Sequence, residues 1–145
     1  MKKLNLTAVI AFVICAAFAF NASSALAKDM TAKDLVAEAS KNVTTISVAD
    51  AKALFDKGGV LFLDCREPKE YKSGHVPGAM NIPRGLLEFQ VTDKIADKNA
   101  TIVMYCKSGG RACLACESLG KMGYQNVKNM EGGWKAWSKA GYPVE

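Results

Sequence analysis

The residues of this chain that could do chemistry gather in one short segment, residues 106–111. Cys106 ends an apolar run and opens the sequence Cys-Lys-Ser-Gly-Gly-Arg, which leads directly into a pattern typical of a helix. Glycine permits the positive φ that turns successive N–H groups inward, and such a nest above a helix N-terminus binds anions and lowers the pKa of a thiol. The segment therefore predicts Cys106 as the catalytic nucleophile for an anionic substrate. The predicted substrate-binding residues are Lys107, Ser108, Gly109, Gly110 and Arg111.

Cys106 also has a purely structural interpretation, because a lone cysteine at a strand end is usually a small apolar core residue. Here a strand end, a glycine-rich loop, a cation at the far end of that loop and an immediate helix coincide, which favours catalysis.

Asp64 and Arg66 follow another apolar run, and we expect them to support the site through an ion pair or hydrogen bonds. His75 is the only histidine, which excludes a His-rich metal site, and we expect neither a metal nor an organic cofactor.

Short apolar runs alternate with helical patterns along the chain, which predicts an α/β fold with a mainly parallel sheet. In such folds the active site lies outside the carboxyl ends of the strands, which is where Cys106 is predicted. In the helix over residues 48–55 we expect Ala49, Ala53 and Leu54 to face inward. The predicted strands are residues 43–46, 60–63, 101–105 and 126–127. The predicted helices are one that begins after an N-cap at Thr31, one over residues 48–55 with an N-cap at Ser47, and two over residues 111–122 and 134–140.

Four groups of motifs, in this order, resemble the single-domain rhodanese family of sulfurtransferases. The resemblance covers nearly all of residues 43–145 and implies a mainly parallel central sheet flanked by helices on both faces. It implies that Cys106 carries a persulfide, whose sulfane sulfur comes from an anionic donor such as thiosulfate and goes to a thiophilic acceptor. That acceptor would be cyanide, a thiol or a sulfur-accepting protein. The motifs are Leu63–Pro68, Gly74–Ala79 with Asn81–Pro83, Cys106–Arg111, and Gly132–Trp137 with Gly141–Pro143.

The spacing between Cys106 and Arg111 bears on the alternative functions. Phosphatases that resemble this family place one more residue between the cysteine and the arginine, which widens the loop for phosphate, whereas four residues intervene here. A phosphatase-like or arsenate-reducing enzyme is therefore disfavoured. A non-enzymatic persulfide carrier or a rhodanese-like interaction module stays open, although an inactive module would not need Cys106.

The N-terminus has the layout of a secretory signal peptide over residues 1–27. Lys2 and Lys3 precede an apolar run over residues 6–20, and the segment ends in Ala25–Ala27, an A-x-A cleavage pattern. We expect a periplasmic or otherwise exported protein without stable membrane insertion after cleavage. Residues 28–145 would then form one rhodanese domain with a helical extension over residues 28–42. Loss of two lysines lowers the net charge from +5 to +3, and without a basic run nucleic-acid binding is not expected.

Three further cysteines accompany Cys106 in the mature chain. Cys113 and Cys116 form a C-x-x-C pair inside a predicted helix, where two buried small apolar residues are expected and a disulfide stays open. Cys65 is likewise expected in the core, and a redox partnership between Cys65 and Cys106 is the alternative.

Overall fold

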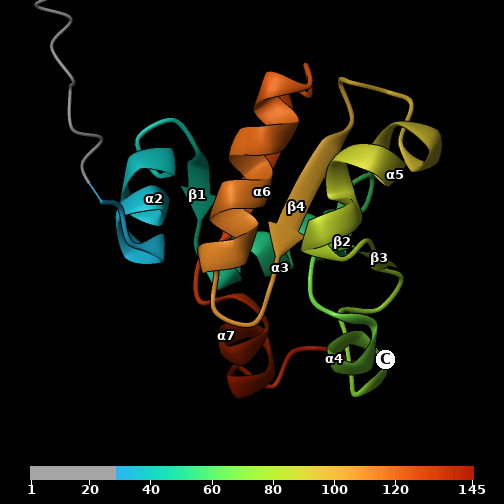
Figure 1. Ribbon diagram of the computed structural model, residues 1–145. Coiled ribbons are helices and arrows are strands. Elements are labelled where there is room, and N and C mark those ends of the chain that lie inside the picture. The colour runs from blue at the N-terminus through green and yellow to red at the C-terminus, as the bar shows by residue number, and fades with distance from the viewer. Residues whose placement is uncertain (1–28) are drawn as a thin grey trace, which may run out of the picture.

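Five strands form one all-parallel sheet in the computed structural model, which describes residues 29–145 (Figure 1). The spatial order is β1-β5-β4-β2-β3, so the strand that leads to Cys106 is central. The predicted signal peptide lies outside the described residues. The strands are β1 (Thr44–Ile46), β2 (Leu61–Asp64), β3 (Met80–Asn81), β4 (Thr101–Tyr105) and β5 (Asn126–Met130). The helices are α2 (Ala32–Ala39), α3 (Val48–Lys57), α4 (Pro68–Lys72), the short 3₁₀ turn η1 (Arg84–Leu86), α5 (Leu87–Lys94), α6 (Gly110–Lys121) and α7 (Gly133–Lys139).

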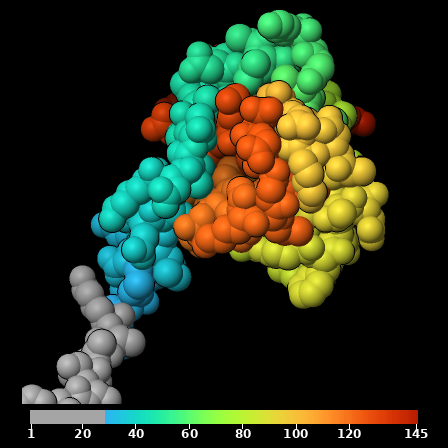
Figure 2. Space-filling view, turned by 90° about the horizontal axis from the view of Figure 1, so that it is seen from above, coloured from blue at the N-terminus to red at the C-terminus, as the bar shows by residue number. Residues whose placement is uncertain are grey.

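Helices cover both faces of the sheet, which confirms the predicted fold class. Alternate residues of a strand point to opposite faces, so Leu63 and Met104 join the core beneath α5 and α6. Phe62 and Val103 join the second core, which includes Trp137 of α7 and Ala51 of α3. Figure 2 shows α6, in orange, lying between the N-terminal segment, in cyan, and α5, in yellow. Because both faces are buried, the continuous apolar runs of β2 and β4 fit a parallel sheet.

Two helices begin at the capping residues that the sequence indicates. The Thr31 hydroxyl accepts a hydrogen bond from the Asp34 N–H at 3.2 Å, and the Asp34 carboxylate accepts one from the Thr31 N–H at 2.9 Å, which makes a capping box for α2. Ser47 caps α3 by accepting from the Asp50 N–H at 3.0 Å. These caps satisfy N–H groups that have no partner within the helix.

The inward face of α3 differs from the prediction. Ala49 and Ala53 are exposed, and the prediction that they face the core is wrong. Ala51 is buried instead, with Val48 and Leu54 partly buried against the same cluster. The start of α3 at Val48 sets this orientation, because positions three apart share one face of a helix. Four short elements, α4, β3, η1 and α5, were not predicted, and β5 extends beyond residues 126–127 to Met130.

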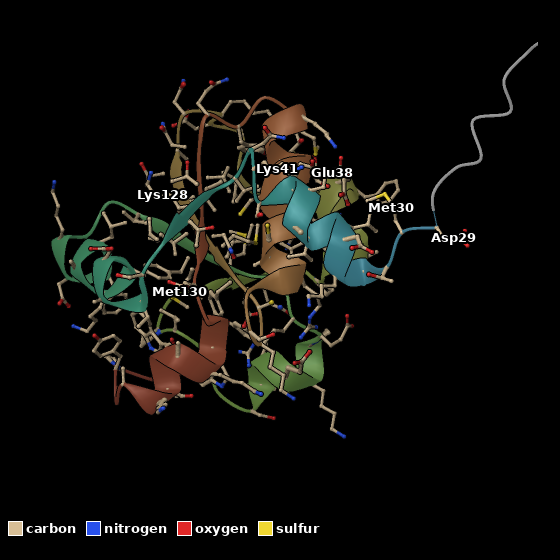
Figure 3. All side chains as sticks on the ribbon, turned by 90° about the vertical axis from the view of Figure 1, so that its left-hand side faces the viewer. Asp29, Met30, Glu38, Lys41, Lys128 and Met130 are labelled. Atoms are coloured by element: carbon tan, nitrogen blue, oxygen red, sulfur yellow. The ribbon has the colours of Figure 1, made fainter. Side chains whose placement is uncertain are left out.

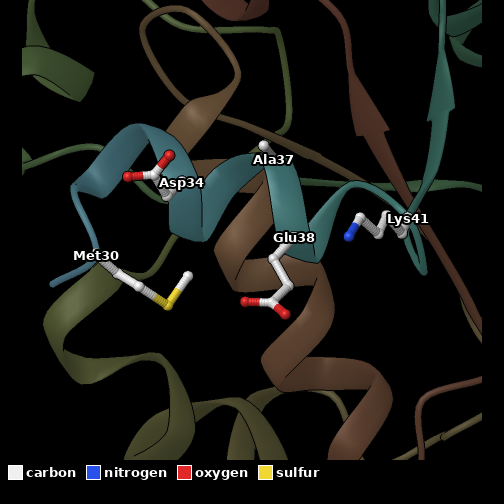
Figure 4. A pocket seen from close by; sticks show the side chains of 5 residues that line it. All are labelled: Met30, Asp34, Ala37, Glu38 and Lys41. Atoms are coloured by element: carbon white, nitrogen blue, oxygen red, sulfur yellow. The ribbon is translucent and has the colours of Figure 1, made fainter. Parts of the chain in front are cut away.

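The N-terminal helix α2 lies across α6, on the α5–α6 side of the sheet (Figure 3). The Val36 carbonyl of α2 accepts a weak hydrogen bond from the Cys113 thiol of α6 at 3.8 Å. A shallow hollow on the outer side of α2 is lined by Met30, Asp34, Ala37, Glu38 and Lys41, and it includes none of the predicted site residues (Figure 4). Within residues 29–145 no helix has the length and apolar character needed to cross a membrane.

Candidate active site

The loop that follows β4 surrounds the sulfur of Cys106 with backbone N–H groups. The Gly109 N–H donates to the Cys106 Sγ at 3.2 Å, and the N–H groups of Ser108 and Ala112 also stabilise its thiolate. Gly109 precedes α6 and has a φ of 101°, a left-handed conformation that favours glycine. Cys106 therefore lies at the carboxyl end of the central strand and at the N-terminus of α6, where amides and the helix dipole favour an anion.

The pKa of Cys106 is lowered to about 5. The largest cause is a hydrogen bond from the thiol of Cys65, and the loop amides add to it, whereas burial alone would raise the pKa. The pKa of Cys65 is raised in turn by this hydrogen bond and by burial, so Cys65 stays protonated and acts as the donor. Cys106 is consequently a thiolate at neutral pH.

The thiolate of Cys106 should titrate in the acid range. Because its pKa is lowered, the charged form is present at neutral pH and disappears as the pH falls through about 5. The difference in thiolate ultraviolet absorbance between the wild-type chain and Cys106→Ser should show this midpoint. A midpoint near the 9.0 of an ordinary thiol would contradict the stabilisation of the thiolate by the Cys65 thiol and the loop amides.

The two cations of the loop occupy different environments. Lys107 is exposed, whereas Arg111 makes a two-pronged ion pair with Glu70 of α4, at 2.9 and 3.0 Å. This ion pair lowers the pKa of Glu70 to about 2 and raises that of Arg111. Arg111 is one of the predicted substrate-binding residues, and here both of its terminal nitrogens donate to Glu70. Its charge still interacts with Cys106, so it contributes to the positive potential around the thiolate.

Asp64 and Arg66 form the expected ion pair, and it is buried. The Arg66 Nη2 donates to Asp64 at 2.6 Å and to the Gly74 carbonyl at 2.8 Å. The guanidinium lies 4.8 Å from the centre of the Trp134 ring, a distance typical of a cation–π contact. The pair therefore packs against Trp134 in the first turn of α7. None of its hydrogen bonds in the described residues reaches the Cys106 sulfur.

The first turn of α7 holds the backbone of the Cys106 loop. The Trp134 N–H donates to the Cys106 carbonyl at 2.7 Å, and the Lys135 N–H donates to the Lys107 carbonyl at 3.1 Å. Gly133 makes this approach possible: a Cβ there would overlap the Cys106 carbonyl oxygen and lie 3.0 Å from the Ser108 nitrogen. The motif Gly132–Trp137 was noted in the sequence, but its contact with the loop was not predicted.

His75 contacts Tyr71 and the C-terminal residue Glu145. Its ring stacks on Tyr71 with a centroid distance of 3.7 Å, and its Nδ1 lies 3.1 Å from the Tyr71 carbonyl oxygen. Its backbone exchanges two hydrogen bonds with Glu145, at 2.9 and 3.0 Å. No group of three His, Cys, Asp or Glu side chains that could hold a metal ion occurs in the described part of the chain.

A buried thiolate within a ring of loop amides, at the carboxyl end of a parallel strand, defines a class of α/β proteins that handle anions through cysteine. Residues 47–140 match the rhodanese-like domain family, and the chain belongs to that family. The recognition made from the motifs and the predicted fold class are both confirmed.

Several sequence relatives are sulfurtransferases. The chain is 35% identical to a sulfurtransferase of Allochromatium vinosum over 94 residues, covering 65% of this chain and 86% of the relative. It is 35% identical to thiosulfate sulfurtransferase 16 of Arabidopsis thaliana over 122 residues, covering 76% and 99%. It is also 38% identical to the thiosulfate sulfurtransferase PspE of Escherichia coli over 71 residues, covering 49% and 68%.

Solved structures have the same fold. A Rhodopseudomonas palustris protein, described as a possible tyrosine phosphatase, is 32% identical with a TM-score of 0.75, over 80% of this chain and 95% of that one. An E. coli rhodanese with anions is 35% identical with a TM-score of 0.53, over 59% and 95%. The chain thus belongs to the rhodanese-like sulfurtransferase family. Its sulfur donor, its acceptor and the roles of its site residues are proposed below.

Proposed function

We propose that the protein transfers sulfane sulfur from thiosulfate to a thiophilic acceptor through a persulfide on Cys106. The observation that carries the proposal is the Cys106 thiolate inside a ring of loop amides, with the Gly109 N–H at 3.2 Å. A thiolate is the nucleophilic form of cysteine, and amides aimed at it also stabilise the negative charge of a persulfide. The thiosulfate sulfurtransferases among the relatives support thiosulfate as the donor.

The reaction divides into two displacements at sulfur. The Cys106 thiolate attacks the sulfane sulfur of thiosulfate, the S–S bond of the donor breaks, and sulfite leaves with the electron pair. The outer sulfur of the resulting persulfide is then attacked by cyanide or a thiolate, which restores the Cys106 thiolate. Neither step needs a metal or an organic cofactor, because each new S–S or S–C bond replaces one S–S bond.

Intact-mass analysis of the purified chain, before and after thiosulfate, tests the persulfide directly. We expect a gain of one sulfur atom, located on Cys106 by peptide mapping and lost again on addition of cyanide. A chain that gains no sulfur would contradict the proposal. Hydrolysis of an aryl phosphate by such a chain would instead favour the phosphatase alternative, and a persulfide formed without steady-state turnover would favour a carrier.

Lys107 should govern the capture of the donor. Its ammonium is exposed on the loop that receives a dianion, so it acts mainly by long-range attraction. We expect Lys107→Ala to raise the KM for thiosulfate by roughly 3-fold to 10-fold at low salt, about 1 kcal/mol, with little change in kcat. The difference from the wild-type chain should shrink as salt is added. An unchanged KM at low ionic strength would show that this lysine is only a solvated surface charge.

We also propose that the protein is exported. The signal-peptide pattern over residues 1–27 supports export, with Lys28 as the first residue of the mature protein. N-terminal sequencing of the protein from the exported fraction tests this proposal. A product that keeps residues 6–20 and stays in the membrane would contradict it.

A further inference from the structure

A second thiol lies beside Cys106 in the core. Cys65 follows β2 and Cys106 follows β4, and the register that pairs Asp64 with Tyr105 makes these cysteines the next pair along the two parallel strands. The Cys65 N–H donates to the Tyr105 carbonyl at 2.9 Å, so the pairing continues beyond the strand ends. Paired positions point to the same face of a sheet, and both thiols belong to the core cluster beneath α5 and α6.

The backbone places these two cysteines at a distance suited to a disulfide. Neighbouring strands lie about 4.8 Å apart, and disulfides join Cα atoms separated by roughly 4.4 to 6.8 Å. Both side chains are buried, with exposed fractions of 0% for Cys65 and 1% for Cys106. Cys65 therefore reaches Cys106 from within the protein, whereas an external acceptor must approach through the loop.

We propose that Cys65 is an internal resolving thiol, which releases the sulfur of the Cys106 persulfide as sulfide when no external acceptor takes it. The inference rests on the persulfide of the proposed function. It gives that persulfide a second fate, release of sulfide, besides transfer to an external acceptor. It assigns a chemical role to a residue that the transfer of sulfur to cyanide does not require as a nucleophile.

The step balances without an outside oxidant. The Cys65 sulfur attacks the Cys106 Sγ, the bond between that Sγ and the sulfane sulfur breaks, and a Cys65–Cys106 disulfide forms. The sulfane sulfur leaves as hydrosulfide with the electron pair and the proton of Cys65. In this step the Cys65 sulfur is oxidised from the thiol to the disulfide level and the sulfane sulfur is reduced to sulfide, whereas Cys106 Sγ already reached the disulfide level when it was loaded. A dithiol reductant is needed only to reopen the disulfide.

The surroundings of Cys65 favour this step only after Cys106 has been loaded. In the free enzyme the Cys106 thiolate accepts a hydrogen bond from Cys65, and this contact raises the pKa of Cys65 and keeps it protonated. In the persulfide the negative charge moves to the outer sulfur, which weakens this restraint on Cys65. The loop N–H groups, led by that of Gly109, would stabilise the departing hydrosulfide.

The test follows one turnover of the reduced, full mature chain with thiosulfate under anaerobic conditions and without acceptor. In the wild-type chain we expect a gain of one sulfur atom, followed by a product that lacks two hydrogens relative to the reduced chain. One sulfide should be released per chain, and peptide mapping should show Cys65 linked to Cys106. With a dithiol present, sulfide release should become catalytic.

In the Cys65→Val variant the sulfur should stay on Cys106. The amount of sulfide released should not exceed the background measured with Cys106→Ser, which forms no persulfide. The comparison is made at a pH where Cys106 of the variant is also ionised, because removal of Cys65 raises its pKa. Cys65→Ser serves as a second variant if valine disturbs packing, and thermal unfolding shows which variant keeps the fold. Cys116→Val is the matched control, since Cys116 is a buried thiol of the same cluster.

The outcomes separate the two proposals. A wild-type chain that gains sulfur and keeps it as long as Cys65→Val does would overturn the resolving role and leave sulfur transfer intact. A disulfide from Cys106 to Cys116 would also overturn it. If neither the wild-type chain nor any variant with Cys106 gains sulfur, the persulfide of the proposed function itself is wrong.

Discussion

Cys106→Ser should abolish sulfur transfer while the fold persists. A serine hydroxyl is not ionised at neutral pH and forms no persulfide, so kcat should fall by roughly 10⁴-fold or more, to background. Oxygen replaces sulfur at a buried position with almost no change in side-chain shape, and the free energy of unfolding should change by only about 1–2 kcal/mol. Steady-state cyanide-dependent turnover, together with urea unfolding, measures both effects.

Cys113→Ser is the matched control for that experiment. Cys113 lies on α6, where its thiol makes only the weak hydrogen bond to the Val36 carbonyl. This variant should keep most of the activity. Wild-type turnover by Cys106→Ser would overturn the assignment of the nucleophile, and loss of turnover in Cys113→Ser at unchanged stability would give the C-x-x-C pair a role in transfer.

Gly133→Ala should be the most damaging substitution outside the thiolate itself. The new Cβ would overlap the Cys106 carbonyl oxygen, and the backbone φ of +54° is already unfavourable for alanine. Relief requires α7 to move away from the loop, which breaks the hydrogen bond from the Trp134 N–H to Cys106. We expect a loss of about 3 kcal/mol or more in unfolding free energy and a large fall in kcat.

Gly141→Ala is the control that separates the cost of the left-handed backbone from the cost of the overlap with the Cys106 carbonyl oxygen. Gly141 has a comparable φ of +70°, but nothing lies within 4 Å of the Cβ that alanine would add. The left-handed backbone alone should cost about 1–2 kcal/mol, with unchanged activity in the folded protein. Equal losses in the two variants would show that the contact between α7 and the loop contributes nothing beyond backbone strain.

The central elements were predictable because their residues follow simple rules. Apolar runs with no polar residue between them fit strands buried on both faces, which predicted β2 and β4 to within one residue. Side-chain caps located the starts of α2 and α3. The segment 106–111 was recognisable because the cysteine, the glycines and the helix start are adjacent in the sequence, so no tertiary contact was needed to bring them together.

Contacts between distant segments were not predictable in the same way. Glu70 lies on α4, a five-residue helix without a clear apolar period, and only the fold brings it to Arg111. The approach of Gly133 to Cys106 depends likewise on how α7 is placed. The contact of Cys65 with Cys106 was foreseen only as an alternative, because it depends on strand order and register, which periodicity alone does not give.

The strand order delays assembly of the site until almost the whole chain is available. β1 pairs only with β5 in the described sheet, although Ile46 and Asn126 are far apart in sequence. A nascent chain that ends before β5 leaves β1 unpaired and lacks the α7 amides that hold the Cys106 carbonyl. Long-range parallel pairing of this kind makes folding slow. The Cys106 carbonyl and the loop that follows it should therefore reach their final positions only after α7 has been synthesised.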